Sequence, residues 1–123
     1  MFESEFCKVE YLQNINAVLC TWKKYCEFND YREPLQYGLK LINQNNATTW
    51  ITDTSNGFES TPEDNEWLAT KFSPQAINST CEKVVFIIKN DSPLKNEIEL
   101  QEQLLKQFFE VELAEELSNV KKC

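Results

Sequence analysis

Two aspartates stand where a cation or a proton could be held. Asp53 and Asp91 each follow a segment that we predict to be a strand of a parallel sheet, and open α/β sheets bind ligands at the carboxyl ends of such strands. Two carboxylates there could coordinate a metal ion or serve as acid and base. The alternative is a structural turn, in which the aspartate accepts a hydrogen bond from a nearby backbone amide. We expect this turn at both positions and no bound metal, because the sequence offers no evident third oxygen ligand.

A serine and a threonine precede the second predicted helix. A phosphate on Ser60 or Thr61 would meet the positive end of that helix, which makes both residues candidates for a phosphorylation switch. Serine and threonine are also preferred helix caps, and plain capping is the alternative that we expect. The loop before them is the candidate segment for binding a ligand or partner, and its candidate residues are Asp53, Thr54, Ser55 and Phe58.

The single arginine of the chain is also a candidate. Arg32 falls in the first turn of a predicted helix, where a cation is slightly unfavourable to the helix dipole. A compensating pair with a carboxylate is the expected reason for its position, and the candidate partners are Asp53 and a first-turn acid. Binding of an anionic ligand is the alternative.

The cysteines do not suggest catalysis. They are Cys7, Cys20, Cys26, Cys81 and Cys123, and the chain has no histidine. A thiol nucleophile would therefore lack its usual base, and zinc would depend on cysteines at unsuitable spacings. We expect reduced thiols, with Cys7 and Cys20 buried as small apolar side chains, and no cofactor.

Several aromatic residues could line an apolar pocket. The candidates are Trp22, Phe28, Trp50 and Trp67, because ligand pockets are commonly lined by aromatic side chains. Phe28 would have to turn inward from a predicted loop. Ordinary core packing is the alternative interpretation.

Composition limits the class of partner. The chain has 123 residues, which is the size of one domain over 1–123, and a formal charge of -8. This charge repels phosphate backbones and anionic lipids, so we expect neither nucleic acid nor a membrane surface as partner. The chain begins without a basic and apolar leader and has no apolar run of membrane-spanning length, which favours a cytoplasmic protein. A homodimer through an edge strand is compatible with the sequence.

The apolar run 84–88 best defines the fold class. Val84-Val85-Phe86-Ile87-Ile88 predicts a strand buried on both faces, and thus a mostly parallel sheet between layers of helices. Alternation over 6–11 predicts an outer strand, a reversal at 13–16 leads to an antiparallel strand over 17–22, and 48–52 is the next strand. A further edge strand over 108–111 is the least defined.

Capping residues and prolines mark the helices. Asp30 and Glu33 have the spacing of a capping box and start the first helix, which Gln44-Asn45-Asn46 ends. Thr61 followed by Pro62 starts the second helix, and Ser73-Pro74 breaks or restarts it.

The predicted helices and strands together give the fold class. Ser92-Pro93 starts the third helix, and a last helix is expected over 113–120. The fold class is therefore α/β, with a mixed sheet of four or five strands in the order β-β-α-β-α-β-α-(β)-α.

Short motifs lie on these elements, namely Trp22, Tyr31-Arg32, Trp50-Ile51-Thr52-Asp53 and Trp67-Leu68. Over roughly residues 6 to 117 the chain thereby resembles the STAS family, named for sulfate transporters and anti-sigma factor antagonists, and in particular the stand-alone STAS-like proteins of bacteria. This resemblance implies a STAS-like fold and a serine switch at the start of the second helix, where this chain has Phe58-Glu59-Ser60-Thr61 and so a glutamate in place of the family's aspartate. Similarity to the lipid-transfer CRAL-TRIO architecture implies an apolar ligand.

These observations predict a non-catalytic regulatory or protein-interaction module, with Ser60 or Thr61 as its switch. The alternative is a carrier or sensor of a small, lipid-like apolar molecule. An enzyme that uses Asp53 and Asp91 is the third hypothesis, for which the sequence shows no nucleophile paired with a base.

Overall fold

A computed structural model describes residues 1–24, 26–55, 61–89 and 95–116. Within them one mixed sheet has six strands in the order β1-β2-β3-β4-β5-β6, which is more than the four or five that the sequence predicts. The strands are β1 (Phe2–Glu3), β2 (Cys7–Leu12), β3 (Ala17–Trp22), β4 (Thr49–Asp53), β5 (Lys83–Ile87) and β6 (Glu110–Ala114). The first three pair antiparallel, and β3 to β6 pair parallel. The α/β class and the mixed sheet are confirmed.

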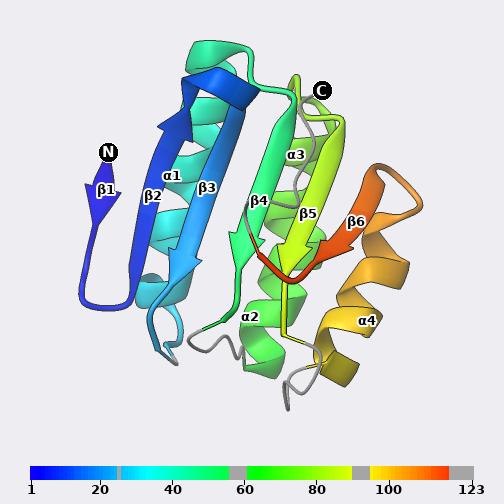
Figure 1. Cartoon of the computed structure of the whole chain (residues 1–123). Helices are drawn as coiled ribbons and strands as arrows, with labels where there is room; N and C mark the ends of the chain where they lie inside the picture. Colours follow the sequence, from blue (N-terminus) through cyan, green and yellow to red (C-terminus); the bar gives the residue numbers. More distant parts are fainter. Residues whose placement is uncertain (25, 56–60, 90–94, 117–123) are drawn as a thin grey trace.

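The described helices cover only one face of the sheet (Figure 1). They are α1 (Asn29–Asn45), α2 (Pro62–Trp67), a π-helical segment (Leu68–Phe72), α3 (Ser73–Ile77) and α4 (Lys95–Leu105). Each new parallel strand is added on the same side of the one before it, so right-handed connections carry every crossover over the same face. The expectation of helices on both faces is therefore wrong for the described part of the chain.

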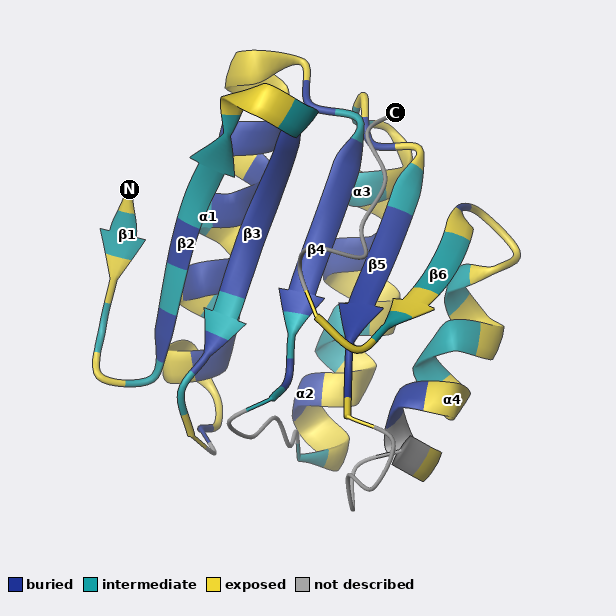
Figure 2. Ribbon diagram, in the orientation of Figure 1, coloured by how far each residue is buried: buried dark blue, intermediate teal, exposed yellow. Residues whose placement is uncertain are grey.

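Two apolar clusters lie on opposite faces of the sheet. The larger one joins β2 to β6 with the helices and includes Val18, Trp22, Ile42 and Phe86. The smaller one lies on the face without helices and consists of Ala17, Leu19, Ile51, Val85 and Ile87. Figure 2 shows β3, β4 and β5 as the most completely buried strands. All five side chains of the run 84–88 are buried, as predicted.

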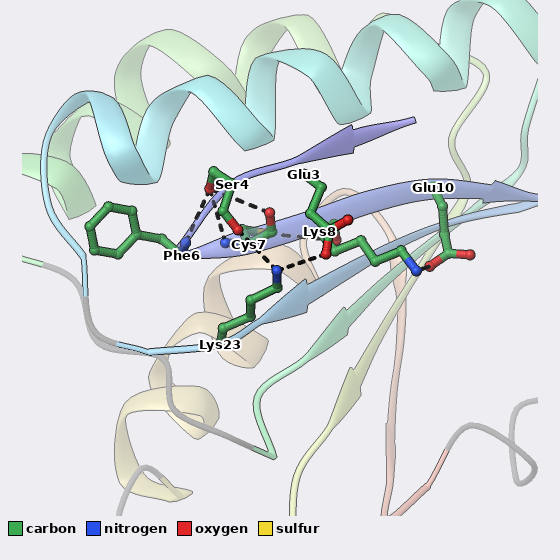
Figure 3. Close-up of polar contacts among 7 residues, drawn as sticks. All are labelled: Glu3, Ser4, Phe6, Cys7, Lys8, Glu10 and Lys23. Atoms are coloured by element: carbon green, nitrogen blue, oxygen red, sulfur yellow. Dashed lines mark hydrogen bonds and ion pairs between the residues drawn. The ribbon is translucent and has the colours of Figure 1, made fainter.

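The N-terminal strand β1 was not predicted. It is two residues long and reaches β2 through a tight turn, in which the Ser4 hydroxyl accepts hydrogen bonds from the amides of Phe6 and Cys7 at 3.1 and 3.2 Å. Lys23, directly after β3, donates to Glu3 Oε2 and to the Ser4 carbonyl, each at 2.9 Å (Figure 3). A lysine two strands away therefore holds this edge of the sheet.

One of the predicted helix starts is wrong and another is confirmed. Helix α1 begins at Asn29 with Phe28 as its cap, so Asp30 lies inside the first turn and does not cap. Helix α2 begins at Pro62, and the Thr61 hydroxyl accepts a hydrogen bond from the Asp64 amide at 3.1 Å, as the capping prediction requires. The third start, at Ser92, lies outside the described residues.

The chain after Thr61 stays helical through Pro74. The π-helical segment precedes this proline, whose missing N–H removes one hydrogen bond from the regular ladder. The Leu68 carbonyl, next to the wider turn, accepts from the Ser73 amide and also from the Ser73 hydroxyl, the latter at 2.7 Å. The predicted break at 73–74 is therefore a change of helix pitch.

At the C-terminal side, the edge strand predicted over 108–111 exists, but it begins two residues later and ends three residues later than predicted. Strand β6 occupies Glu110–Ala114, so Leu113 and Ala114 are strand residues rather than the start of a last helix. The remainder of that predicted helix, over 117–120, lies outside the described residues. No helix in the described ranges has the length and apolar character needed to cross a lipid bilayer.

Gly38 provides a test of how closely α1 packs on the sheet. A Cβ atom at this position would penetrate the indole of Trp50 on β4 and lie 2.9 Å from its Cζ3 atom. Gly38→Ala should therefore lower the free energy of unfolding by about 1–3 kcal/mol, although alanine favours an isolated helix by about 1 kcal/mol. Urea unfolding measures the change. Lys40→Ala, at an exposed position of the same helix, is the control. A Gly38→Ala variant more stable than the wild type would contradict this packing.

Candidate functional site

The carboxyl edge of the parallel strands carries a compact group of polar and aromatic side chains. Helices α1 and α2 both begin there (Figure 1). We call the group formed by Phe28, Arg32, Asp64 and Trp67 the Arg32 cluster. Its members come from the connection between β3 and α1, from the first turn of α1 and from α2, so the fold brings together residues that are far apart in the sequence.

Asp64 lies at the centre of the Arg32 cluster and is completely buried. Its Oδ1 atom accepts from Arg32 Nε at 2.9 Å, and its Oδ2 atom accepts from the Phe28 amide at 2.8 Å and from the Thr61 hydroxyl at 3.0 Å. A buried carboxylate without partners would cost several kcal/mol. Three donors, one of them charged, offset this cost and join α1 to the start of α2.

Arg32 lies between two aromatic rings. Its Cζ atom is 5.8 Å from the ring centroid of Phe28 and 5.4 Å from that of Trp67. Its side chain is 28% exposed. The hydrogen bond from its Nε to Asp64 and the two cation–π contacts together restrict the positions that the guanidinium can take.

Phe28 has a backbone conformation that L-residues rarely adopt. Its φ is 52° and its ψ is -125°, and its side chain is nevertheless 49% exposed. Such a conformation costs on the order of 1–3 kcal/mol. Burial of the ring does not offset this cost, whereas the hydrogen bond from its amide to the buried Asp64 carboxylate does. The chain thus holds a half-exposed aromatic ring by means of a strained backbone.

Arg32 pairs with a carboxylate, as expected for a cation at that position. The acid is Asp64, in the first turn of α2, and the contact runs through Nε. Asp53 is not that partner, because its Oδ1 atom accepts from the Ser55 amide at 2.9 Å in the structural turn predicted for it. Thr54 is buried and continues the pairing with β5, since its amide and hydroxyl both donate to the Ile87 carbonyl.

Other predicted site residues are placed as follows. Phe58, Ser60 and Asp91 lie outside the described residues. Thr61 is half-buried. Its hydroxyl accepts a hydrogen bond from the Asp64 amide and donates one to Asp64 Oδ2, which confirms capping at this residue. In the described ranges, no three carboxylates, thiols or imidazoles converge as a metal-binding group.

The apolar pocket differs from its predicted form. A cavity of about 60 Å³ between the sheet and the helices is lined by Trp22 and Trp50, but neither Phe28 nor Trp67 lines it. An apolar cavity that holds benzene has about 150 Å³, so this one has no room for a fatty-acid chain. Gln101 also lines it, and its Nε2 atom is buried without a hydrogen-bond partner among the described residues.

The cysteines of the described residues behave as core side chains. Cys7, Cys20, Cys26 and Cys81 are free thiols and buried, as predicted for Cys7 and Cys20. Burial raises the pKa of Cys7 to about 12 and that of Cys26 to about 11, and it raises the pKa of Cys20 strongly. These three thiols therefore stay protonated at neutral pH and are poor nucleophiles.

No protein-family model, curated protein or solved structure matches this chain significantly. The resemblance to STAS proteins therefore stays a prediction that rests on short motifs.

The strain at Phe28 predicts an unusual order of stability between two variants. Because glycine adopts positive φ freely and alanine does not, Phe28→Gly should be more stable than Phe28→Ala by about 1 kcal/mol. Glu27, whose φ is not positive, is the control position. There the glycine variant should be no more stable than the alanine variant, because glycine has more conformational freedom in the unfolded chain.

Urea unfolding of the four variants measures both differences, and the comparison removes the effect of losing each side chain. If Phe28→Ala equals or exceeds Phe28→Gly in stability, the backbone at residue 28 is not strained.

Proposed function

We propose that this chain is a non-catalytic regulatory module that binds a protein partner through the Arg32 cluster at the carboxyl edge of its sheet. The observation that carries the proposal is the exposed ring of Phe28, which a strained backbone holds beside Arg32 and Trp67. Strained backbone is concentrated at functional sites. Aromatic residues and arginine are the side chains most enriched at the energetic centres of protein interfaces.

The preorganised position of these side chains supports binding rather than packing. Phe28 is 49% exposed, so a partner that covers it would gain apolar burial that folding leaves unused. Arg32 is held by Asp64 and by two rings, so little side-chain freedom would be lost when a partner contacts it. Both features lower the cost of association.

Thr61 is the residue through which this surface could be switched. Its hydroxyl donates to Asp64 Oδ2, the same atom that accepts from the Phe28 amide. A phosphate on Thr61 would place negative charge beside a buried carboxylate and would compete with it for Arg32. Phosphorylation would thereby release Phe28 from the conformation that presents its ring. Ser60, the other predicted switch residue, stays a proposal without a described position.

The alternative function, transport or sensing of an apolar molecule, has less support. The side-chain amide nitrogen of Gln101, which has no partner among the described residues, favours a ligand with one hydrogen-bond acceptor. The cavity of about 60 Å³ would admit only a very small one. The protein-binding module is therefore the function that the described geometry supports better.

Site-specific photo-cross-linking tests the proposal. Benzoylphenylalanine replaces Phe28 in one variant and Ile77, which is 39% exposed at the end of α3, in a second. We expect residue 28 to give a discrete cross-linked protein in cells that naturally produce this chain, and residue 77 to give none. Combining the residue-28 probe with Thr61→Glu should abolish the product, whereas Thr61→Ser, which keeps the hydroxyl, should retain it.

Equal products from residues 28 and 77, or a product from residue 77 alone, would refute a binding surface at the Arg32 cluster. A product at residue 28 that Thr61→Glu leaves unchanged would refute the switch and leave the surface intact.

A further inference from the structure

Strand β6 is the last strand of the sheet in the described part of the chain. It pairs with β5, and no described strand lies on its other side. Figure 2 shows β6 as only partly buried along its length, in contrast to β5. The opposite edge, β1, is two residues long and is held by the turn at Ser4. Of the two edges, only β6 is long enough to pair with several residues of a partner.

The direction of the backbone groups of β6 follows from two hydrogen bonds. The Glu110 amide donates to the Glu82 carbonyl, and the Ala114 carbonyl accepts from the Ile88 amide. Because backbone groups alternate in direction along a strand, residues 110, 112 and 114 face β5. The amides and carbonyls of Val111 and Leu113 therefore point outward, where an added strand would pair.

The side chains of β6 divide by chemistry between the two faces of the sheet. Val111 packs with the larger cluster on the helix side. Leu113 is 40% exposed and borders a cavity of about 240 Å³ that is also lined by Ile88 and Ile98. Glu110 and Glu112 lie on the face without helices. There Glu112 Oε2 forms an ion pair with Lys83 Nζ at 3.3 Å. A strand added here would meet apolar groups on one face and carboxylates on the other.

The charge of β6 determines which kind of strand could pair with its outer edge. Residues 110–116 contain Glu110, Glu112, Glu115 and Glu116 and no basic residue. A second copy of β6 would bring like charges together across the new pairing, which is unfavourable. The same carboxylates would attract lysine or arginine side chains of a different segment, so charge disfavours self-pairing and favours a basic partner.

We propose that the β6 edge binds an extended protein segment in which basic and apolar residues alternate, by adding it as a seventh strand. The basic side chains contact Glu110 and Glu112, and the apolar ones contact Leu113 and the adjoining cavity. Main-chain pairing to Val111 and Leu113 provides affinity, and the alternation provides specificity. This surface lies apart from the Arg32 cluster and does not depend on the function proposed for it.

Hydrogen exchange of the β6 amides, measured by NMR on the full chain, tests the proposal. The probe is a blocked hexapeptide of alternating lysine and valine, and the comparison peptide has glutamate in place of lysine. We expect the amides of Val111 and Leu113 to exchange freely in the chain alone and to be protected by the lysine peptide only. The Glu112 amide, which already faces β5, should not change.

Charge reversal supplies the matched variants. Glu110→Lys should weaken binding of the lysine peptide by about threefold or more, since it replaces an attractive cross-strand pair with a like-charge pair. Glu33→Lys, which makes the same change of net charge on α1, should leave it unchanged. Phe28→Ala should also leave it unchanged, which separates this surface from the Arg32 cluster.

Three results would overturn the proposal. One is exchange at Val111 and Leu113 that saturating lysine peptide does not slow. Another is protection of these amides in the chain alone, because the edge would then already be covered by another part of the chain or by a second copy. The third is equal protection by the two peptides, because charge would then not select the partner.

Discussion

The carboxylate of Asp64 is the buried charge on which the carboxyl edge of this molecule depends. It accepts from Arg32, from the Phe28 amide and from Thr61, and so connects the start of α1 with the start of α2. Removing one partner of a buried ion pair generally costs about 3–5 kcal/mol, a large part of the roughly 5–15 kcal/mol that stabilises a domain. The same network maintains the strained geometry of Phe28.

The sheet topology explains why this edge is where the molecule presents its unusual features. Successive parallel strands are added in one direction, so α1 and α2 begin at the carboxyl edge and the described helices cover one face (Figure 1). The same order leaves β6 at the end of the sheet with no described neighbour beyond it. The positions of both proposed interaction surfaces, the Arg32 cluster and the β6 edge, thus follow from the sequential order of the parallel strands.

Local patterns predicted much of the fold. Strand β3 was predicted over the residues that it occupies, because Ala17 to Trp22 are continuously apolar apart from Thr21, and Thr61 caps α2 as its residue type indicates. The number of strands and the one-sided helices were not predictable in this way. They depend on pairings between distant segments, such as that of β5 with β6, and on short ones such as that of Phe2 with Val9, which no local pattern encodes.

The candidate site was predicted only in part. An acidic partner for Arg32 was inferred from the helix dipole, but the choice of Asp64 over Asp53 depends on how two helices meet. The positive φ of Phe28 could not be predicted from the sequence, because such a conformation is usually expected at glycine or asparagine and not at phenylalanine. Trp67 contacts Arg32 and does not line the apolar cavity, which again depends on how α2 meets α1.

The most direct measurement is hydrogen exchange at the Phe28 amide in the wild type and in Asp64→Ala. Asp30→Ala is the control variant, and the Ile51 amide reports global unfolding. If Asp64 holds Phe28 in place, this amide is protected in the wild type and in the control, and in Asp64→Ala it exchanges freely while Ile51 stays protected. A Phe28 amide that is unprotected in the wild type, or equally protected in Asp64→Ala, would contradict the account.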